Sequence, residues 1–275
     1  MECRERWEKR ERLALERKGF RVLRLLGEGA FSRVYCVERN ATYACKVSEN
    51  VGLLEREALV LSELRHTLFP AYGRLWQEEG CGFLLMEYVP GSSMEEMLKR
   101  RGGFCARQVA AAGTELASGL SYLHERQENW LFRDVKPANI IIRQNGRLSL
   151  LDFGCVCSVR ESALSQAGSP GFAAPEQLKG GQLLTKACDV YGLGQTLKVM
   201  HRTRGGGRGR DASDKFAPAL SQLLDLCTKK EVSRRLPDMG SVMERLWQLC
   251  RQMGYYPEKS GGLCREVLCR KDVWL

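Results

Sequence analysis

The chain has 275 residues, of which 44% are hydrophobic and 28% charged, so it has the composition of a folded globular protein rather than a disordered one. It contains no run approaching the roughly 18 apolar residues of a membrane-spanning helix, and its charged N-terminus lacks the apolar core of a secretion signal. The net charge of +10 identifies no partner, and because acidic and basic residues are mixed along most of the chain we predict no specific nucleic-acid binding.

Twelve cysteines raise the question of a disulfide framework or a metal site. Disulfide frameworks belong mainly to short secreted chains, so we expect reduced thiols and a cytoplasmic location. The pairs Cys155/Cys157 and Cys264/Cys269 do not match the paired spacing of a zinc site. No metal bound by cysteine is therefore predicted.

Charged residues of both signs fill most of residues 1–19. Glu2, Glu5 and Glu8 each precede a basic residue by four positions, the order that favours ion pairs along a helix. This predicts a charged surface helix. Over residues 20–48, short runs rich in Val, Leu, Tyr and Cys are broken by GEGAFS and RNAT, which predicts three successive antiparallel strands.

A helix and two more strands are predicted next. Glu57, Leu61 and Leu64 recur at helical spacing, so the helix would carry one carboxylate on its apolar side. Strands are expected around residues 71–76 and 82–87, before the connecting segment YVPGSS. Beyond that segment, apolar stripes predict three long helices, formed by Val109, Ala112, Leu116, Leu120 and Leu123; by Leu220, Leu223, Leu224 and Cys227; and by Val242, Met243, Leu246 and Leu249.

The turn between the first two predicted strands, GEGAFSRVY, contains Gly27 and Gly29. Glycine lets backbone amides approach a polyphosphate, although most hairpin glycines are simply turn residues. The third glycine of the pattern G-x-G-x-x-G is replaced by Ser32. A dinucleotide-binding turn would lead into a helix, whereas VYCVERN followed by TYACKV indicates a continued hairpin, so the context argues against a Rossmann motif.

Lys46 ends the alternating strand TYACKV, where a lysine would ordinarily be a solvent-exposed edge charge. Glu57 follows on the predicted helix that would pack over this sheet. An ion pair between these two residues could hold the lysine toward phosphate oxygens.

The most informative stretch is LFRDVKPANIII followed by LSLLDFGC, which places Asp134, Asn139 and Asp152 around a predicted strand pair. Asp and Asn are common turn and capping residues, but their joint order here is improbable for unrelated turns. At these motifs the sequence resembles the eukaryotic-type (Hanks-type) serine/threonine protein kinase family. The resemblance implies that Asp134 accepts or orients the proton of a substrate hydroxyl, while Asn139 and Asp152 bind Mg²⁺. Lys136 is typical of the serine/threonine members and would stabilise the phosphate being transferred.

The resemblance runs from about Phe20 to Cys250 and implies an α+β, bilobal protein kinase fold. The expected N-lobe, residues 20–88, has a small antiparallel sheet with one helix, and the C-lobe, residues 89–252, is larger and mostly α-helical. A C-terminal tail, residues 253–275, would follow.

The family pattern also implies a set of functional positions, with ATP and Mg²⁺ as cofactors. The catalytic set would be Lys46, Glu57, Asp134 and Lys136. Adenine would lie between the lobes against a main-chain hinge. The nucleotide-binding positions are Gly27, Glu28, Gly29, Ala30, Phe31, Ser32, Val34, Ala44, Lys46, the gatekeeper Met86, the hinge residues Glu87 and Val89, and the metal ligands Asn139 and Asp152.

GSPGFAAPE resembles the end of a kinase activation segment, in which Glu176 would pair with Arg235. Asp189 would brace the backbone of the catalytic loop. Arg133, before Asp134, is typical of kinases whose activation segment is ordered by a phosphate, so regulation by phosphorylation is a hypothesis. The candidate acceptors are Ser158, Ser162, Ser165 and Ser169, of which Ser169 also matches a position that contacts Asp134 and Lys136.

Besides Ser32 in place of the third glycine, two departures from the family pattern stand out. Phe132 replaces the usual histidine, and the Gly/Arg-rich segment 201–210 leaves little room for the helix that usually follows. We predict a kinase that transfers the γ-phosphate of Mg-ATP to Ser or Thr of protein substrates, including itself. The main alternative is a pseudokinase scaffold that binds nucleotide without catalysis. Small-molecule phosphotransferases of related fold are less consistent, because they generally lack the activation segment.

Overall fold

The computed structural model describes residues 2–29, 31–164, 166–202 and 215–255. Ala30, Ser165, most of the Gly/Arg segment and most of the predicted tail lie outside these residues. The described chain forms two compact units. Unit 1 comprises residues up to Arg65 together with Pro70–Val89, and unit 2 comprises His66–Phe69 together with the chain from Pro90.

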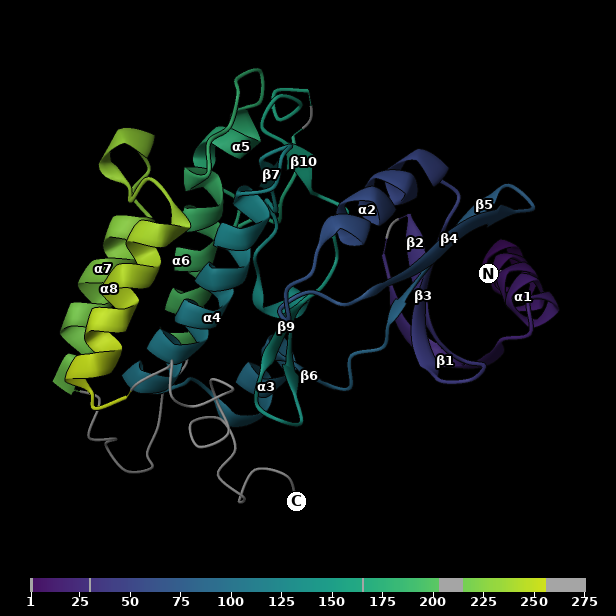
Figure 1. The fold of residues 1–275 in the computed structure, drawn as a ribbon, viewed down its shortest axis with the longest axis horizontal. Coiled ribbons are helices and arrows are strands. Elements are labelled where there is room, and N and C mark those ends of the chain that lie inside the picture. The colour runs from purple at the N-terminus through teal and green to yellow at the C-terminus, as the bar shows by residue number, and fades with distance from the viewer. Residues whose placement is uncertain (1, 30, 165, 203–214, 256–275) are drawn as a thin grey trace. The chain divides into compact units, whose positions relative to one another are not determined.

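Unit 1 is a five-stranded antiparallel sheet with two helices (Figure 1). The strand order is β1-β2-β3-β5-β4. This confirms the predicted small antiparallel sheet. Its elements are α1 (Glu2–Arg17), β1 (Arg21–Glu28), β2 (Ser32–Glu38), β3 (Thr42–Ser48), α2 (Val51–Glu63), β4 (Tyr72–Glu78) and β5 (Cys81–Glu87).

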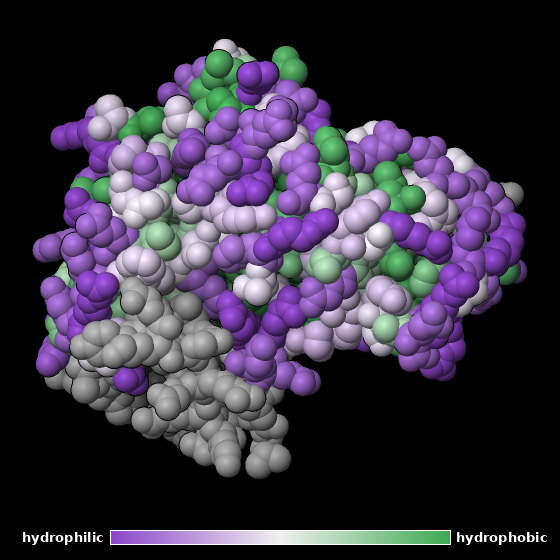
Figure 2. All heavy atoms as spheres, viewed as in Figure 1, coloured by the Kyte–Doolittle hydropathy of each residue, from purple (hydrophilic) through white to green (hydrophobic). Residues whose placement is uncertain are grey.

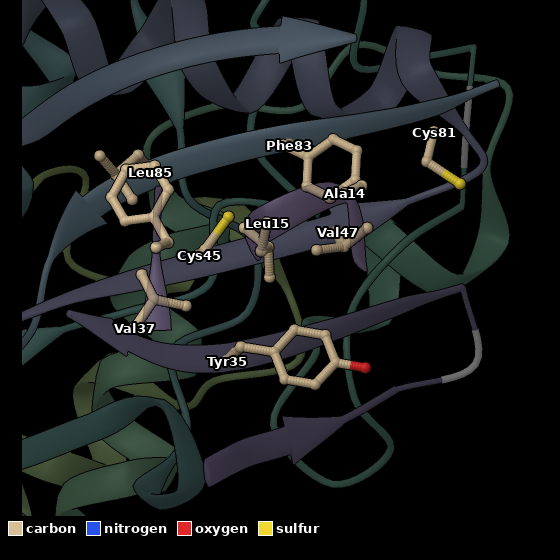
Figure 3. Close-up of a cluster of buried hydrophobic side chains, with 10 residues drawn as sticks. Ala14, Leu15, Tyr35, Val37, Cys45, Val47, Cys81, Phe83 and Leu85 are labelled. Atoms are coloured by element: carbon tan, nitrogen blue, oxygen red, sulfur yellow. The ribbon is translucent and has the colours of Figure 1, made fainter. Parts of the chain in front are cut away.

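One face of this sheet carries the principal hydrophobic cluster of unit 1. Alternate residues of β2 and β3 point to opposite faces because side chains alternate along a strand. Ala14 and Leu15 of α1 join this cluster, so the charged N-terminal helix packs against the sheet instead of standing apart from it (Figure 3). The buried members are Ala14, Leu15, Phe20, Tyr35, Val37, Cys45, Val47, Cys81, Phe83 and Leu85.

The opposite face carries the side chains predicted to bind nucleotide. Val34 pairs with Lys46 across β2 and β3, and Ala44 pairs with Met86 across β3 and β5. These four residues alternate with the cluster members, so they share the second face. Leu84, which pairs with Lys46, packs against Leu54 and Ala58, which places α2 on this face as well.

Unit 2 is larger and mainly helical, as predicted (Figure 1). Among the described residues its longest helix is α4. The predicted apolar stripes of α4 and α7 are buried, and so is that of α8 except for Met243, which is only partly buried. Its helices are α3 (Met94–Arg101), α4 (Ala106–His124), α5 (Pro175–Lys179), α6 (Ala187–Arg202), α7 (Ala217–Cys227) and α8 (Met239–Gln252). Its strands are β6 (Gly91–Ser93), β7 (Trp130–Leu131), β8 (Ile140–Arg143), β9 (Leu148–Leu150) and β10 (Cys157–Ser158), with 3-10 turns at Pro137–Asn139 and Val232–Arg234.

Helix α4 forms the centre of unit 2 because small residues let its neighbours approach closely. A Cβ atom on Gly113 would lie 2.8 Å from Leu197 of α6 and 2.9 Å from Leu246 of α8. Such separations are too short for real carbon contacts, so a larger residue would force the Leu197 and Leu246 side chains to move. Polar side chains cover most of the face shown in Figure 2, and no helix among the described residues is long and apolar enough to cross a membrane.

The sequence did not indicate that His66–Phe69, inside the expected N-lobe, would join unit 2. The Leu68 carbonyl accepts a hydrogen bond of 2.8 Å from the Leu150 amide, and a Cβ on Gly119 would lie 2.2 Å from the Leu68 side chain. The backbone and the side chain of Leu68 are therefore both tied to unit 2.

Candidate active site

The loop between β7 and β8 gathers polar side chains around Asp134. Lys136 Nζ lies 2.8 Å from Asp134 Oδ2 and donates a hydrogen bond of 2.6 Å to Ser169 Oγ. The Ser169 amide donates to Asp134 Oδ1 at 3.0 Å. Asn139 Nδ2 donates to both the carbonyl and Oδ2 of Asp134, at 3.0 and 3.1 Å. This network fixes the carboxylate in one orientation, with a cationic group beside it.

The backbone ahead of Asp134 is held by a buried carboxylate on α6. Asp189 accepts hydrogen bonds from the amides of Phe132 at 2.8 Å and Arg133 at 2.6 Å. Nε2 of His124, at the end of α4, lies 2.8 Å from the same carboxylate. Arg133 has a φ of +65°, which is unfavourable for a residue with a side chain, so the Asp189 contacts offset strain in the loop. The part played by His124 was not apparent from the sequence.

Asn139 and Asp152 are suited to a magnesium ion. The Leu151 amide donates to the Asn139 carbonyl at 2.8 Å, so Asp152 is one residue beyond the point at which the two segments pair. Because Asn139 Nδ2 is bonded to Asp134, its Oδ1 is the side-chain atom left to bind a cation. Asp152 is exposed and has a φ of +68°. Mg²⁺ prefers such oxygen ligands, one or two of them from protein and others from phosphates and water.

In unit 1, Lys46 and Glu57 form a buried ion pair. Lys46 Nζ lies 2.7 Å from each carboxylate oxygen of Glu57, and both side chains are less than one-tenth exposed. Glu57 reaches the sheet because α2 lies on the Lys46 face. The pair fixes the position of a cationic group on the same surface as Val34, Ala44 and Met86.

Gly27 and Gly29 are not required by the packing of the chain. A Cβ on Gly27 would meet nothing within 4 Å, and one on Gly29 would make only ordinary contacts at 3.8 Å. Neither residue has a positive φ. Gly27 pairs with Val34, so the open space beside it adjoins the Lys46 face. Neither packing nor backbone conformation therefore explains the two glycines. Their lack of side chains fits a loop whose backbone is approached by phosphates.

The remaining predicted nucleotide residues lie in the same hairpin and at the end of β5. Phe31 is 77% exposed, and its carbonyl accepts a hydrogen bond of 2.7 Å from Ser48 Oγ. Glu28 is bonded to Arg33, and Ser32 begins β2. Glu87 exchanges hydrogen bonds with Ala71, and Val89 is the last residue of unit 1. The predicted residues thus form one group in unit 1 and another in unit 2.

Comparisons with known proteins identify the family of this constellation. The family model for the protein kinase domain matches residues 20–260. The chain belongs to the protein kinase family. Helix α1 precedes the residues that the family model matches.

Serine/threonine and other protein kinases from several kingdoms are similar to this kinase. The mitogen-activated protein kinase kinase kinase YODA of Arabidopsis thaliana is 32% identical over 196 residues, covering 66% of this chain and 22% of the relative. The serine/threonine-protein kinase PrkC of Bacillus subtilis is 28% identical over 193 residues, covering 65% and 29%. The human cAMP-dependent protein kinase catalytic subunit PRKX is 30% identical over 188 residues, covering 64% and 51%. The match therefore spans no more than about half of each of these relatives.

Phe132 takes a packing role in the kinase core. It is fully buried, and its ring meets that of Phe153 edge to face, with centroids 5.6 Å apart. Phe69 contacts Phe153 at 5.7 Å in the same manner. The Phe132 ring thus packs against Phe153, the phenylalanine of the DFG motif at residues 152–154.

Burial raises the pKa of the neighbouring Cys155 thiol to about 11, so this thiol stays protonated at neutral pH.

Two serines of the activation segment, Ser158 and Ser162, are buried and hydrogen-bonded. Ser162 is 2% exposed, donates to the Val159 carbonyl at 2.6 Å and accepts from the Leu184 amide at 2.8 Å. Ser158 is 3% exposed and donates to Glu161. The hypothesis that these two serines are phosphate acceptors does not fit the structure, because in this conformation both hydroxyls are buried and bonded.

Proposed function

We propose that this kinase transfers the γ-phosphate of Mg-ATP to serine or threonine hydroxyls of protein substrates. The observation that carries the proposal is the network of Asp134, Lys136 and Ser169. It supplies a fixed carboxylate for a hydroxyl proton and a cation for a phosphoryl group, which are the groups that phosphoryl transfer to an alcohol requires.

Each of the predicted site residues has a defined role in this proposal. Asp134 orients the acceptor hydroxyl and receives its proton as the hydroxyl oxygen bonds to the γ-phosphorus, while the bond from that phosphorus to the β,γ-bridging oxygen of ATP breaks and ADP leaves. Lys136 neutralises charge on the phosphoryl oxygens, and Lys46, held by Glu57, does the same for the phosphates of the bound nucleotide. Asn139 and Asp152 would hold magnesium, which would neutralise phosphate charge when bound.

The pseudokinase alternative, a scaffold that binds nucleotide without catalysis, does not account for the network around Asp134. A scaffold that only binds nucleotide would have no use for a carboxylate and a lysine bonded to one serine, whereas Lys136 and Asp134 are arranged in that way. We therefore favour catalysis, including transfer to serines of the kinase itself.

The deciding experiment is phosphate transfer from labelled ATP with magnesium, in the wild type and in Asp152→Asn, with and without a basic protein acceptor. We expect label on serine or threonine of acceptor and kinase, and none in the variant because it lacks a metal ligand. If the wild type bound a fluorescent ATP analogue but transferred no phosphate, the pseudokinase scaffold would be established instead.

Buried serines also allow a prediction about modification. We expect mass spectrometry of purified, active kinase to find Ser158 and Ser162 without phosphate. Ser162→Ala should lower the free energy of unfolding by about 1–3 kcal/mol, because the buried Leu184 amide loses its acceptor. Ser241→Ala, which removes a partly exposed hydroxyl that donates to Asp238 at 2.9 Å, is the control for thermal unfolding. Stoichiometric phosphate on Ser158 or Ser162 in active kinase would contradict the prediction.

A further inference from the structure

The carboxylate of Glu11 on α1 is hydrogen-bonded to the base of the hairpin that joins β1 and β2, called here the glycine-rich hairpin because its turn contains Gly27 and Gly29. Glu11 is only 4% exposed. Its Oε1 accepts a hydrogen bond of 2.9 Å from Arg33 Nη1, and its Oε2 accepts one of 2.6 Å from the Tyr35 hydroxyl. Both partners are on β2, so the carboxylate joins a helix outside the matched kinase region to the strand that leaves the hairpin.

Arg33 extends this connection to the other strand of the hairpin. It pairs with Glu28 in the register of β1 and β2, and its Nε lies 3.3 Å from Glu28 Oε1. Glu28 directly precedes Gly29, whose amide donates to the Ser32 carbonyl at 2.8 Å. The guanidinium group thus bridges the carboxylates of Glu11 and Glu28 where the hairpin begins to turn.

Helix α1 belongs to unit 1 and packs on its sheet through Ala14 and Leu15, so it can serve as an anchor. Ala14 and Leu15 are buried in the sheet cluster, where Figure 3 shows them with Tyr35. At the C-terminal half of the helix, Arg10 and Arg17 pair with Glu79 in the turn between β4 and β5. Burial and the adjacent carboxylate raise the pKa of the Tyr35 phenol well above its usual value, so its hydroxyl remains a neutral donor.

We propose that Glu11 is a positioning residue for nucleotide binding, which acts through Arg33 to hold the glycine-rich hairpin in the conformation that receives the phosphates of ATP. The inference rests on the proposed use of ATP by this kinase. Without the carboxylate, the ion pair that Arg33 keeps among the described residues is the one with Glu28, and the hairpin base loses its charged link to α1. The hairpin then samples more conformations, and ATP binding must order it again.

Kinetics of Glu11→Gln test the proposal, because the amide keeps the shape of the side chain and removes its charge. We expect the KM for ATP to rise about threefold to tenfold with kcat within about twofold of the wild type, a range typical of coupling within one ion-pair network. Arg33→Gln should raise KM by a similar factor, and the double variant should add little. Equal KM values in the wild type and both single variants would overturn the proposal.

Two controls separate positioning from stability. Tyr35→Phe removes the other bond to Glu11 but leaves the Arg33 contact, so thermal stability should fall without a rise in KM. Glu8→Gln weakens a partly buried pair with Arg12 on the same helix, which makes no bond to Arg33, and should change neither quantity. A rise in KM in Tyr35→Phe as large as that in Glu11→Gln would show that the carboxylate acts only through general stability.

Hydrogen exchange gives a readout that does not depend on catalysis. In nucleotide-free protein, amides of residues 27–29 and 31–33 should exchange about threefold to tenfold faster in Glu11→Gln than in the wild type, while those of α2 are unchanged. If the wild type transferred no phosphate but the variants showed this exchange and weaker Mg-ATP binding, the proposed function would fail and the role of Glu11 would stand. Unchanged exchange in the hairpin would reject that role.

Discussion

Asp134→Asn is expected to lower kcat by about a thousandfold while leaving the Kd for Mg-ATP close to that of the wild type. A positioned general base typically contributes about 10²- to 10⁴-fold to such a reaction, and an amide cannot accept the hydroxyl proton. The amide oxygen can still accept one of the hydrogen bonds now made to Asp134 by Lys136, Asn139 and Ser169. The loop should therefore keep its conformation.

Single-turnover transfer of labelled phosphate measures the chemical step, and titration with a fluorescent ATP analogue measures binding. Asp225→Asn is the matched control, because its carboxylate is 61% exposed and pairs with Lys198 away from the loop. It should leave kcat unchanged. If Asp134→Asn retained more than about a tenth of wild-type kcat, Asp134 would not be the base or orienting group that its contacts suggest.

Secondary-structure elements, and the contacts between residues that belong to recognisable motifs, could be predicted from the sequence. Hydrophobic periodicity predicted the strands of unit 1 and the helices α4, α7 and α8, since these patterns record which face is buried. The expected pairs of Lys46 with Glu57 and of Glu176 with Arg235 are present. Spacing on the predicted strand and helix suggested the first pair, whereas the resemblance to the kinase family implied the second, whose members are 59 positions apart; the roles of these residues in catalysis stay proposals.

Contacts made by common residues at long range could not be predicted. Glu11 is one of many charged residues near the N-terminus, and its partner Arg33 lies 22 positions away, so no local pattern distinguishes it from a solvated glutamate. His124 and Asp189 are separated by 65 positions. The burial of Ser162 depends on the Leu184 amide, a main-chain group that carries no signal in the side-chain sequence.

Glu176→Gln is expected to destabilise the kinase more than any other single change of charge considered above. The Arg235 side chain is fully buried, and its Nη1 and Nη2 lie 2.6 and 3.1 Å from the two oxygens of Glu176. It also donates to the Ala187 carbonyl at 2.7 Å. Removing the carboxylate charge leaves a buried cation uncompensated, so the free energy of unfolding should fall by about 3–5 kcal/mol.

Thermal unfolding should show this loss as a Tm lower by roughly 10 °C, given a shift of about 2–4 °C per kcal/mol in a protein of this size. The control is Glu231→Gln, which breaks the neighbouring pair of Glu231 and Arg234, with both side chains about two-thirds exposed. It should cost less than about 1 kcal/mol. Equal Tm values for the two variants would show that the buried pair adds nothing beyond an exposed one.

The double variant Glu176→Gln with Arg235→Met tests why the loss occurs. If an unpaired cation is the cause, removing the arginine as well should restore part of the stability, because the double variant buries no charge. Activity should not recover with it. Glu176 lies in α5 beside Gln177, whose side chain holds the carbonyls of Arg133 and Ala167 at 2.9 and 3.0 Å. Loosening α5 therefore disturbs the segment that presents Ser169 to Lys136, so transfer should remain slow even where folding is restored.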